Sequence, residues 1–552
     1  MPTTRVVLLS LALAATVSAQ SSPPHAPRAR VTDDFVALGP LKPLPAPVAA
    51  AADAVRADAL AAHIAMLASP AFEGRGLGTR GLEATAEYLA ASLALAGIPP
   101  LTAPTAGPAT AAYFHPVPMR EIRARGGELV VDVWQGDTSS SRTFRHGVDL
   151  LLPESGPEEV TAPVVFAGFG VRETAPARDD YRGLEVKDKL VVVLGGLPAG
   201  AEWQTPAMRA RYDASGDERH AARLAHALAA GARGVLVIEP ADFPSQVARQ
   251  AQEAPPVVFL PYHRDAVWRP GVVRVSGAVG EALLATAGLT TGTAASAEPR
   301  ELRGVTVTLR ATGEERLGTS RNVVGVLQGS DPALASEAVV IGAHMDHLGR
   351  RGDTIFFGAD DNASGTASLL EIAKAMAASR VRPKRTIVFA FWTGEEEGHL
   401  GSDHYVRHPL WPLERTAAYV NLDMVGHPWT PGEVRQLVTD AKLPDADRFL
   451  KATPAADFLE GGLAAWAPEI APLLVRAAQG TGVALHVDRG EGKNGGSDYR
   501  AFARREVPWL RFFGNFFDGY HEPADTADRL DAGQVRKMAR LALAAAWLIA
   551  DK

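Results

Sequence analysis

The sequence contains no cysteine among its 552 residues. This absence excludes structural disulfides, catalysis by a thiolate, zinc sites built from cysteine and lipid anchors attached to cysteine. The fold must therefore be stabilised by core burial, for which a chain of this length is large enough. Any metal ion must be held by histidine and carboxylate side chains, and this narrows the search for a functional site.

Basic clusters and long apolar runs are also scarce. No stretch combines clustered lysine and arginine with interleaved aromatic residues, and the formal net charge is only −7. A nucleic acid is therefore not expected as a partner. Beyond the N-terminus, no segment has the length and apolarity of a membrane-spanning helix.

The first 19 residues have the pattern of an export signal. Arg5 supplies a positive charge, residues 6–17 are a short apolar run, and residues 17–19 (Val-Ser-Ala) resemble a signal-peptidase cleavage site. Because the apolar run is shorter than the roughly 20 residues that span a bilayer, cleavage is favoured over a retained N-terminal anchor. The sequence predicts a signal peptide at residues 1–19 and a secreted or periplasmic protein without membrane contact after cleavage.

The rest of the chain divides by composition into a linker and two domains. Residues 20–51 are rich in proline and alanine and are predicted to be a linker. Residues 126–289 contain short β-rich runs, one clear helical run at 221–230 and no cluster with metal-ligand spacing. We interpret them as a non-catalytic β-rich domain inserted into a larger domain, which is formed by residues 52–125 and 290–552.

The larger domain has the pattern of an α/β fold. Apolar strands alternate with helical segments, which is typical of a layered domain with a buried sheet. The expected strands are 338–341, 386–391, 418–422 and 508–512, and the expected helices are 82–96, 363–378, 399–406, 469–480 and 532–549.

Polar clusters follow these strands, and they contain the side chains of a metal site. The clusters are Gly342–His347, Gly358–Gly365, Trp392–Gly398, Asp423–Met424 and Gly519–Pro523. Ligands of open α/β sheets bind beyond the carboxyl ends of the strands, so the clusters can converge there. Zinc accepts imidazole nitrogen and carboxylate oxygen, and a zinc pair needs a bridging ligand, which a carboxylate can supply. A further carboxylate that binds no metal is then needed as a general base.

Each cluster taken alone has a simpler interpretation. His344 can be a hydrogen-bonded loop histidine, Asp360 and Asp361 can cap the following helix, and residues 395–397 can be solvated charges at a helix N-terminus. Asp423 is harder to explain in this way, because a carboxylate that ends an apolar strand is costly to bury without a partner. The five clusters together favour a metal site.

In order and spacing, five blocks resemble Peptidase family M28, a family of zinc peptidases. The blocks are Ala343-His344-Met345-Asp346, Asp361-Asn362-Ala363-Ser364-Gly365, Gly394-Glu395-Glu396 through Gly401-Ser402, Asn421-Leu422-Asp423-Met424 and Gly519-Tyr520-His521. The resemblance covers most of residues 301–552 and extends weakly to residues 67–76. Residues 163–193 are similar to the protease-associated (PA) domain that is often inserted in this family.

The resemblance implies a phosphorylase/hydrolase-like, three-layer α/β/α fold with two Zn²⁺ ions. It implies that His344 and Asp423 hold one zinc ion, that Glu396 and His521 hold the other, and that Asp361 bridges them. The choice of Asp361 over its neighbour Asp360 depends on the position before Asn362-Ala363-Ser364-Gly365.

The resemblance also implies the remaining roles. Glu395 corresponds to the general acid/base and Tyr520 to a donor that stabilises the oxyanion, while Asp346 is placed to orient His344. His347, His399 and Ser497-Asp498 are expected to have supporting roles, and Glu397 is expected to have none.

These roles imply a zinc-dependent exopeptidase that hydrolyses N-terminal residues from peptides. A carboxypeptidase-type enzyme of the same family is the nearest alternative, and it needs a cation for the terminal carboxylate. A glutaminyl cyclase typically binds one zinc ion, and a receptor-like binding protein on this scaffold is expected to lack ligands. The complete set of five ligands argues against the last two.

Overall fold

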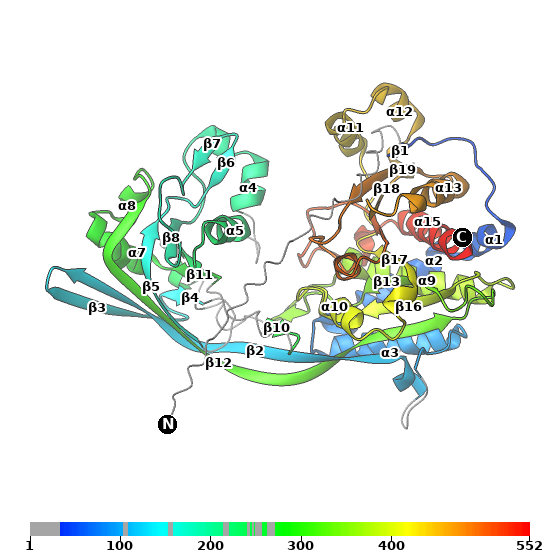
Figure 1. Ribbon diagram of the computed structural model, residues 1–552, viewed down its shortest axis with the longest axis horizontal. Coiled ribbons are helices and arrows are strands. Elements are labelled where there is room, and N and C mark those ends of the chain that lie inside the picture. Colours follow the sequence, from blue (N-terminus) through cyan, green and yellow to red (C-terminus); the bar gives the residue numbers. More distant parts are fainter. Residues whose placement is uncertain are drawn as a thin grey trace, which may run out of the picture.

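The computed structural model describes residues 34–102, 109–152, 158–213, 220–239, 243–245, 248, 257–261 and 271–552. The predicted signal peptide and the first part of the predicted linker lie outside the described residues. Two lobes are joined by a pair of long antiparallel strands, β2 and β12 (Figure 1).

The larger lobe is built on a mixed sheet with the strand order β1-β19-β18-β20-β17-β13-β16-β12. Strands β16, β13, β17 and β20 are parallel neighbours, whereas β12 is antiparallel to β16, and β18 is antiparallel to β20. Every residue of β13 and β16 is buried, which explains their continuous apolar sequence. The bounds are β1 Phe35–Val36, β12 Arg300–Leu327, β13 Ala338–His344, β16 Thr386–Trp392, β17 Thr416–Leu422, β18 Phe458–Ala464, β19 Ala484–Gly490 and β20 Trp509–Phe513, with the small hairpin β14 Arg350–Arg351 and β15 Thr354–Ile355 outside this sheet.

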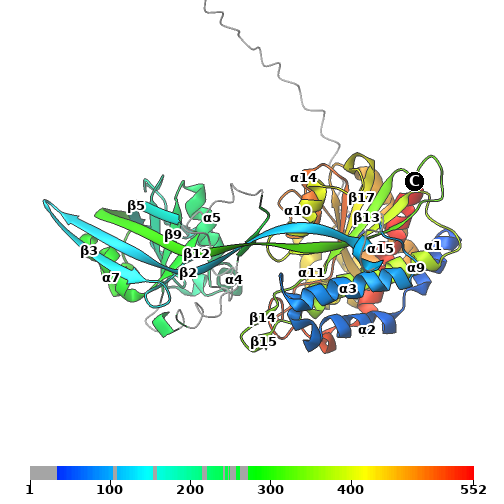
Figure 2. The ribbon, with the colours of Figure 1, turned by 90° about the horizontal axis from the view of Figure 1, so that it is seen from below.

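Helices lie on both sides of this sheet. Figure 2 shows α10 and α14 on one side of β13 and β17, and α1, α9 and α15 on the other. The bounds are α1 Ala46–Ala54, α2 Ala57–Leu67, α3 Arg80–Leu95, α9 Gly365–Ala378, α10 Leu400–Arg407, α11 Pro431–Asp440, α12 Ala446–Ala452, α13 Ala471–Thr481, α14 Tyr499–Arg504 and α15 Ala532–Asp551. Within the described residues, no helix is both long enough and apolar enough to cross a membrane.

The strands and helices predicted for this lobe agree with the structure to within a few residues, so the predicted mixed α/β fold is confirmed. One difference lies in the predicted linker, residues 20–51. Helix α1 begins inside it, at Ala46, because Val48, Ala51 and Ala52 are buried in the core next to α15. The proline-rich composition concealed this short apolar face.

The smaller lobe continues the same sheet through β12, in the order β12-β5-β8-β9-β11-β4, and β5, β8, β9 and β11 are parallel. Its hydrophobic clusters are separate from the core of the larger lobe. The bounds are β2 Phe114–Gln135, β3 Thr138–Arg145, β4 Leu150–Leu151, β5 Glu158–Phe166, β6 Arg172–Thr174, β7 Ala177–Asp179, β8 Leu190–Leu194, β9 Gly234–Ile238, β10 Val257–Phe259, β11 Val272–Val275, α4 Pro206–Tyr212, α5 Ala221–Ala229, α7 Gly277–Leu284 and α8 Thr291–Ala294.

The predicted boundaries of the smaller lobe, residues 126 and 289, differ from those in the structure. The predicted start, residue 126, falls within β2, and the core of the lobe includes Ala294 and side chains up to Ala311, beyond the predicted end at residue 289. The reason is that β2 and β12 pair from Val133–Val305 to Phe114–Val323, with a single irregularity after Thr312. Backbone hydrogen bonding therefore runs from one lobe into the other without a linker.

Candidate metal centre and active site

The five predicted metal ligands lie at the carboxyl ends of neighbouring strands. His344 is the last residue of β13, Asp423 directly follows β17, and Glu396 lies in the loop after β16. His521 lies between β20 and α15, and Asp361 belongs to the irregular turn Ala359–Ser364 that precedes α9. The parallel strands bring these side chains to one edge of the sheet.

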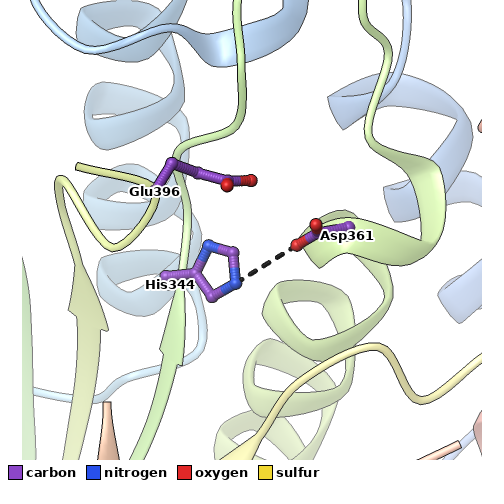
Figure 3. A group of neighbouring side chains, drawn as sticks. All are labelled: His344, Asp361 and Glu396. Atoms are coloured by element: carbon purple, nitrogen blue, oxygen red, sulfur yellow. Dashed lines mark ion pairs between the residues drawn. The ribbon is translucent and has the colours of Figure 1, made fainter. Parts of the chain in front are cut away.

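The structure arranges the five side chains as two groups that share Asp361. In the first group, Nε2 of His344 is 3.3 Å from Oδ1 of Asp361 and 3.2 Å from Oδ1 of Asp423. In the second, Nε2 of His521 is 3.2 Å from Oδ2 of Asp361 and 3.1 Å from Oε2 of Glu396. Figure 3 shows His344 and Asp361 facing one another, with Glu396 beside them. Asp361 therefore presents one oxygen to each group.

The distances and atom types fit a pair of zinc ions. Two ligand atoms at 2.0–2.1 Å from a tetrahedral zinc ion lie about 3.3–3.4 Å apart, close to the separations within each group. His344 and Asp361 are buried, and a buried cluster with more carboxylates than imidazoles requires a cation for charge balance. The donor set of imidazole nitrogen and carboxylate oxygen is the one that zinc accepts.

The carboxylates change the protonation of both histidines. Burial lowers the pKa of His344, but Asp423, Glu395 and Asp361 outweigh burial and raise this pKa well above its usual value. Burial also lowers the pKa of His521, while Asp361 and Glu396 raise it, to about 11. Without a metal ion, both imidazoles are therefore protonated at neutral pH.

Zinc uptake by the metal-free protein is expected to release protons, because an imidazole must be deprotonated before it binds zinc. Since the pKa values of His344 and His521 are raised, the release should be about two protons per zinc pair at pH 7, and affinity should rise with pH. Calorimetric titration in two buffers of different ionisation enthalpy measures this number. A binding heat that does not depend on the buffer would contradict the expectation.

Glu395 lies beside the two groups. It makes none of the ion contacts described for His344 and His521. It lines the pocket, and its Oε1 is 3.1 Å from Nε2 of His399. Burial raises the pKa of Glu395 well above its usual value; His344 opposes this rise, and Asp423 and Glu396 add to it. A carboxyl group with a raised pKa binds a proton more readily than an ordinary carboxylate, as a general acid/base requires.

Asp346 supports this region differently from the prediction. Its carboxylate accepts hydrogen bonds from the backbone N–H groups of Glu395 and Glu396, at 3.2 and 3.3 Å. Nδ1 of His344 is 3.2 Å from the backbone oxygen of Asp346 and 3.9 Å from its carboxylate. The imidazole is therefore oriented mainly by the main chain, while the carboxylate positions the loop that carries Glu395.

The two adjacent aspartates have separate functions. The carboxylate of Asp360 accepts a hydrogen bond of 2.7 Å from the backbone N–H of Gly426, whereas Asp361 faces the histidines. Asp525 accepts hydrogen bonds from the backbone N–H groups of Asp360 and Asp361, at 2.9 and 3.1 Å. Asp525 therefore fixes the turn that carries the shared ligand, a function that no sequence motif indicated.

His347 and the Ser497-Asp498 pair contact the site residues or their supports, as their predicted supporting roles require. Nδ1 of His347 is 2.7 Å from Oε1 of Glu396. Ser497 accepts a hydrogen bond from the side chain of Asn421, which belongs to β17, and Asp498 accepts one from Ser402 of α10.

Arg75 is the main supporting residue that the sequence did not reveal. Its side chain is only 1% exposed, and it donates hydrogen bonds of 2.7–3.0 Å to the backbone oxygens of Leu67, Met345, Phe357 and Gly358. It thus connects α2 with the loops on either side of the predicted metal ligands. An arginine in a glycine-rich stretch gives no sequence signal for this role.

Replacing Arg75 by methionine is expected to destabilise the protein by about 3 kcal/mol or more, because several buried carbonyls lose their donor. Urea unfolding measures the loss, and Arg182→Met, at an exposed position, is the matched control. A loss below about 1 kcal/mol would show that water replaces the guanidinium.

A pocket of about 190 Å³ opens beside the two groups. Tyr520 lines it, and its ring stacks on His521 with 3.9 Å between ring centroids. The walls beyond the metal ligands are mainly apolar or aromatic and are formed by Met424, Tyr499, Arg511, Phe512, Phe513 and Phe516.

The chain is similar in sequence to a known family and to individual proteins. Residues 322–546 match the sequence profile of Peptidase family M28. Leupeptin-inactivating enzyme 1 of Streptomyces exfoliatus is 33% identical over 130 residues, which are 23% of this chain and 27% of that protein. Leucine aminopeptidase 2 of Arthroderma otae is 25% identical over 252 residues, 42% of this chain and 45% of that protein.

These matches span less than half the length of either relative. Among solved structures, an aminopeptidase from Aneurinibacillus sp. strain AM-1 aligns over 90% of this chain and 94% of its own, with 17% sequence identity and a TM-score of 0.49.

Proposed function

Because residues 322–546 are a domain of Peptidase family M28, we propose that the protein is a two-zinc exopeptidase that removes N-terminal residues from peptides. The observation that supports this most is the position of Asp361 between two His/carboxylate groups, next to Glu395. This arrangement has a place for two metal ions, a place for a substrate and a further carboxyl group for proton transfer.

A bound zinc pair would supply Lewis acidity towards the scissile carbonyl and lower the pKa of a shared water. Glu395 accepts the proton of the attacking water and passes it to the leaving amine, a function that its raised pKa favours. Tyr520, which lines the pocket, would donate a hydrogen bond to the developing oxyanion, a contribution of about 3 kcal/mol for donors of this type.

The charges of the pocket favour an aminopeptidase over a carboxypeptidase. A carboxypeptidase needs a cation that is free to bind the terminal carboxylate, and Arg511 is the only lysine or arginine among the described residues that line the pocket. Its Nη2 is 2.9 Å from Oε1 of Glu460 and 2.9 Å from Oδ2 of Asp488. The guanidinium is therefore already paired, and no other lysine or arginine among the described lining residues is available for a terminal carboxylate.

The complete ligand set also favours this function over a glutaminyl cyclase or a receptor-like binding protein. For the smaller lobe we propose a PA-like domain that restricts access or positions peptides, and for the larger lobe a phosphorylase/hydrolase-like α/β/α fold. Export through the N-terminal signal would place the enzyme outside the cytoplasm or in the periplasm.

Removal of the smaller lobe is expected to change the ratio of activities on long and short peptides. Glu121 of β2 and Arg316 of β12 face one another in the ladder between these strands. The lobe can therefore be removed by replacing the residues between Glu121 and Arg316 with a short turn. Comparing kcat/KM for a dipeptide and a ten-residue peptide measures the effect. An unchanged ratio in a folded, active variant would contradict the proposed role of the lobe.

The hydrolysis of leucine p-nitroanilide tests the proposed activity. Release of p-nitroaniline is expected to stop after treatment with a chelator and to return when Zn²⁺ is added, because the proposed mechanism depends on zinc to polarise the scissile carbonyl. Activity that survives complete metal removal would contradict a zinc-dependent mechanism.

A further inference from the structure

Arg511 lines the pocket on the side of β20 and is paired with two carboxylates, those of Glu460 and Asp488. The proposed mechanism uses none of these three charges. Arg511 of β20 lies in register with Gly462 of β18, which lies in register with Asp488 of β19. Glu460 is two positions before Gly462 on β18 and faces the same side of the strand. The three charged side chains therefore lie on neighbouring strands, at the side of the pocket.

Gly462 makes this arrangement possible. A Cβ atom at this position would lie 2.6 Å from Nε and 2.7 Å from Cγ of Arg511. Because Gly462 has no side chain, Arg511 lies flat across β18 and reaches Asp488 on the next strand. Its guanidinium contacts both Glu460 and Asp488 at 2.9 Å.

The guanidinium is thereby neutralised at the place where a substrate side chain would enter. One positive charge is matched by two carboxylates, of which Asp488 is half exposed and Glu460 is largely buried, with Nδ1 of His486 3.7 Å from its second oxygen. The neighbouring walls are aromatic: Phe513 contacts Phe516 with 4.9 Å between centroids, and the Tyr499 ring packs on Trp509 at 4.6 Å. The pocket thus has apolar surface and no free cation among its described lining residues.

We propose that Glu460 and Asp488 determine the charge preference of this pocket by keeping Arg511 paired. This inference rests on the proposed aminopeptidase function and adds the class of substrate. Peptides with a large apolar N-terminal side chain are accepted, because it packs on the aromatic walls. N-terminal aspartate and glutamate are rejected, because they find no free cation and meet the surplus carboxylate.

The variant E460Q/D488N tests this assignment, because it leaves Arg511 in place with both of its anionic partners neutralised. The quantity to measure is the ratio of kcat/KM for N-terminal glutamate to kcat/KM for N-terminal leucine, on p-nitroanilides. This ratio should rise by about tenfold or more, the contribution of one charge-assisted hydrogen bond. Adding R511M to the double variant should abolish the rise.

A matched control exists in the β2–β12 ribbon. Arg310 is paired there with Glu128 and Glu159, at 2.8 and 2.9 Å, and none of these three residues is among the described residues that line the pocket. The variant E128Q/E159Q removes the same two charges around one arginine, and it should leave the ratio unchanged. If E460Q/D488N folds poorly, D488N alone, at the more exposed position, should give a smaller rise.

The outcomes separate this inference from the proposed function. A wild-type protein that cleaves the leucine substrate and also cleaves the glutamate substrate equally well would overturn the inference alone. An active E460Q/D488N variant with an unchanged ratio would do the same. A wild-type protein with zinc that cleaves neither substrate would overturn the proposed function.

Discussion

Replacing Glu395 by glutamine is expected to lower kcat by about 10²–10⁴, the usual contribution of a positioned general acid/base. The amide is nearly isosteric with the carboxyl group but can neither accept the proton of the attacking water nor return it to the leaving amine. Zinc content should stay at the wild-type level, because Glu395 lies near His344 and Asp423 but makes none of the ion contacts of His344 and His521. Steady-state kinetics and elemental analysis of the same preparation measure both quantities.

Glu397→Gln is the matched control for this variant. The residue is two positions away in the same loop, and it is not among the described residues that line the pocket. Its activity should stay within about twofold of wild type, as for most substitutions outside a site. Loss of zinc from Glu395→Gln, or activity near wild type, would show that the roles of Glu395 and Glu396 are assigned wrongly.

Replacing Asp361 by alanine is expected to lower zinc binding from two ions to at most one and to abolish most of the activity. Asp361 is the only one of the five side chains with oxygens within 3.3 Å of both His344 and His521. Its removal leaves each histidine with a single carboxylate partner, which is fewer than the three protein ligands typical of a catalytic zinc ion. Elemental analysis after dialysis gives the stoichiometry.

Asp360→Asn provides the comparison at the neighbouring position. The amide oxygen can still accept the hydrogen bond from Gly426, so two zinc ions should remain bound. Full zinc occupancy and normal turnover in Asp361→Ala would exclude a bridging role for this residue.

The sequence predicted the parallel strands β13, β16, β17 and β20 of the larger lobe well, because they are almost entirely buried, but it did not predict β1, β12, β18 and β19. The continuous apolar runs of β13 and β16 leave few alternatives to a buried parallel sheet. The smaller lobe was harder to delimit, since Gly126-Gly127 and Gly313 interrupt the apolar pattern of β2 and β12. Strands β2 and β12 stay extended over their full length because they are hydrogen-bonded to one another. The sequence of either strand alone does not reveal this pairing.

The site residues that could be predicted from the sequence are those whose side chains belong to a short local motif. His344, Asp423 and His521 each follow or end an apolar strand, and the structure brings them together with Asp361 and Glu396. Arg75 and Asp525 were not found, because most of the backbone groups that they contact belong to residues more than 150 positions away. Arg511 became informative only when β18 and β19 were placed beside it.

Mass spectrometry of one peptide in three forms, each with and without a zinc chelator, distinguishes the removal of N-terminal residues from the removal of C-terminal residues. The forms are free at both ends, acetylated at the N-terminus and amidated at the C-terminus. We expect chelator-sensitive shortening from the N-terminus of the free and amidated peptides, and none of the acetylated peptide. Shortening that amidation blocks and acetylation does not would contradict the account and identify a carboxypeptidase.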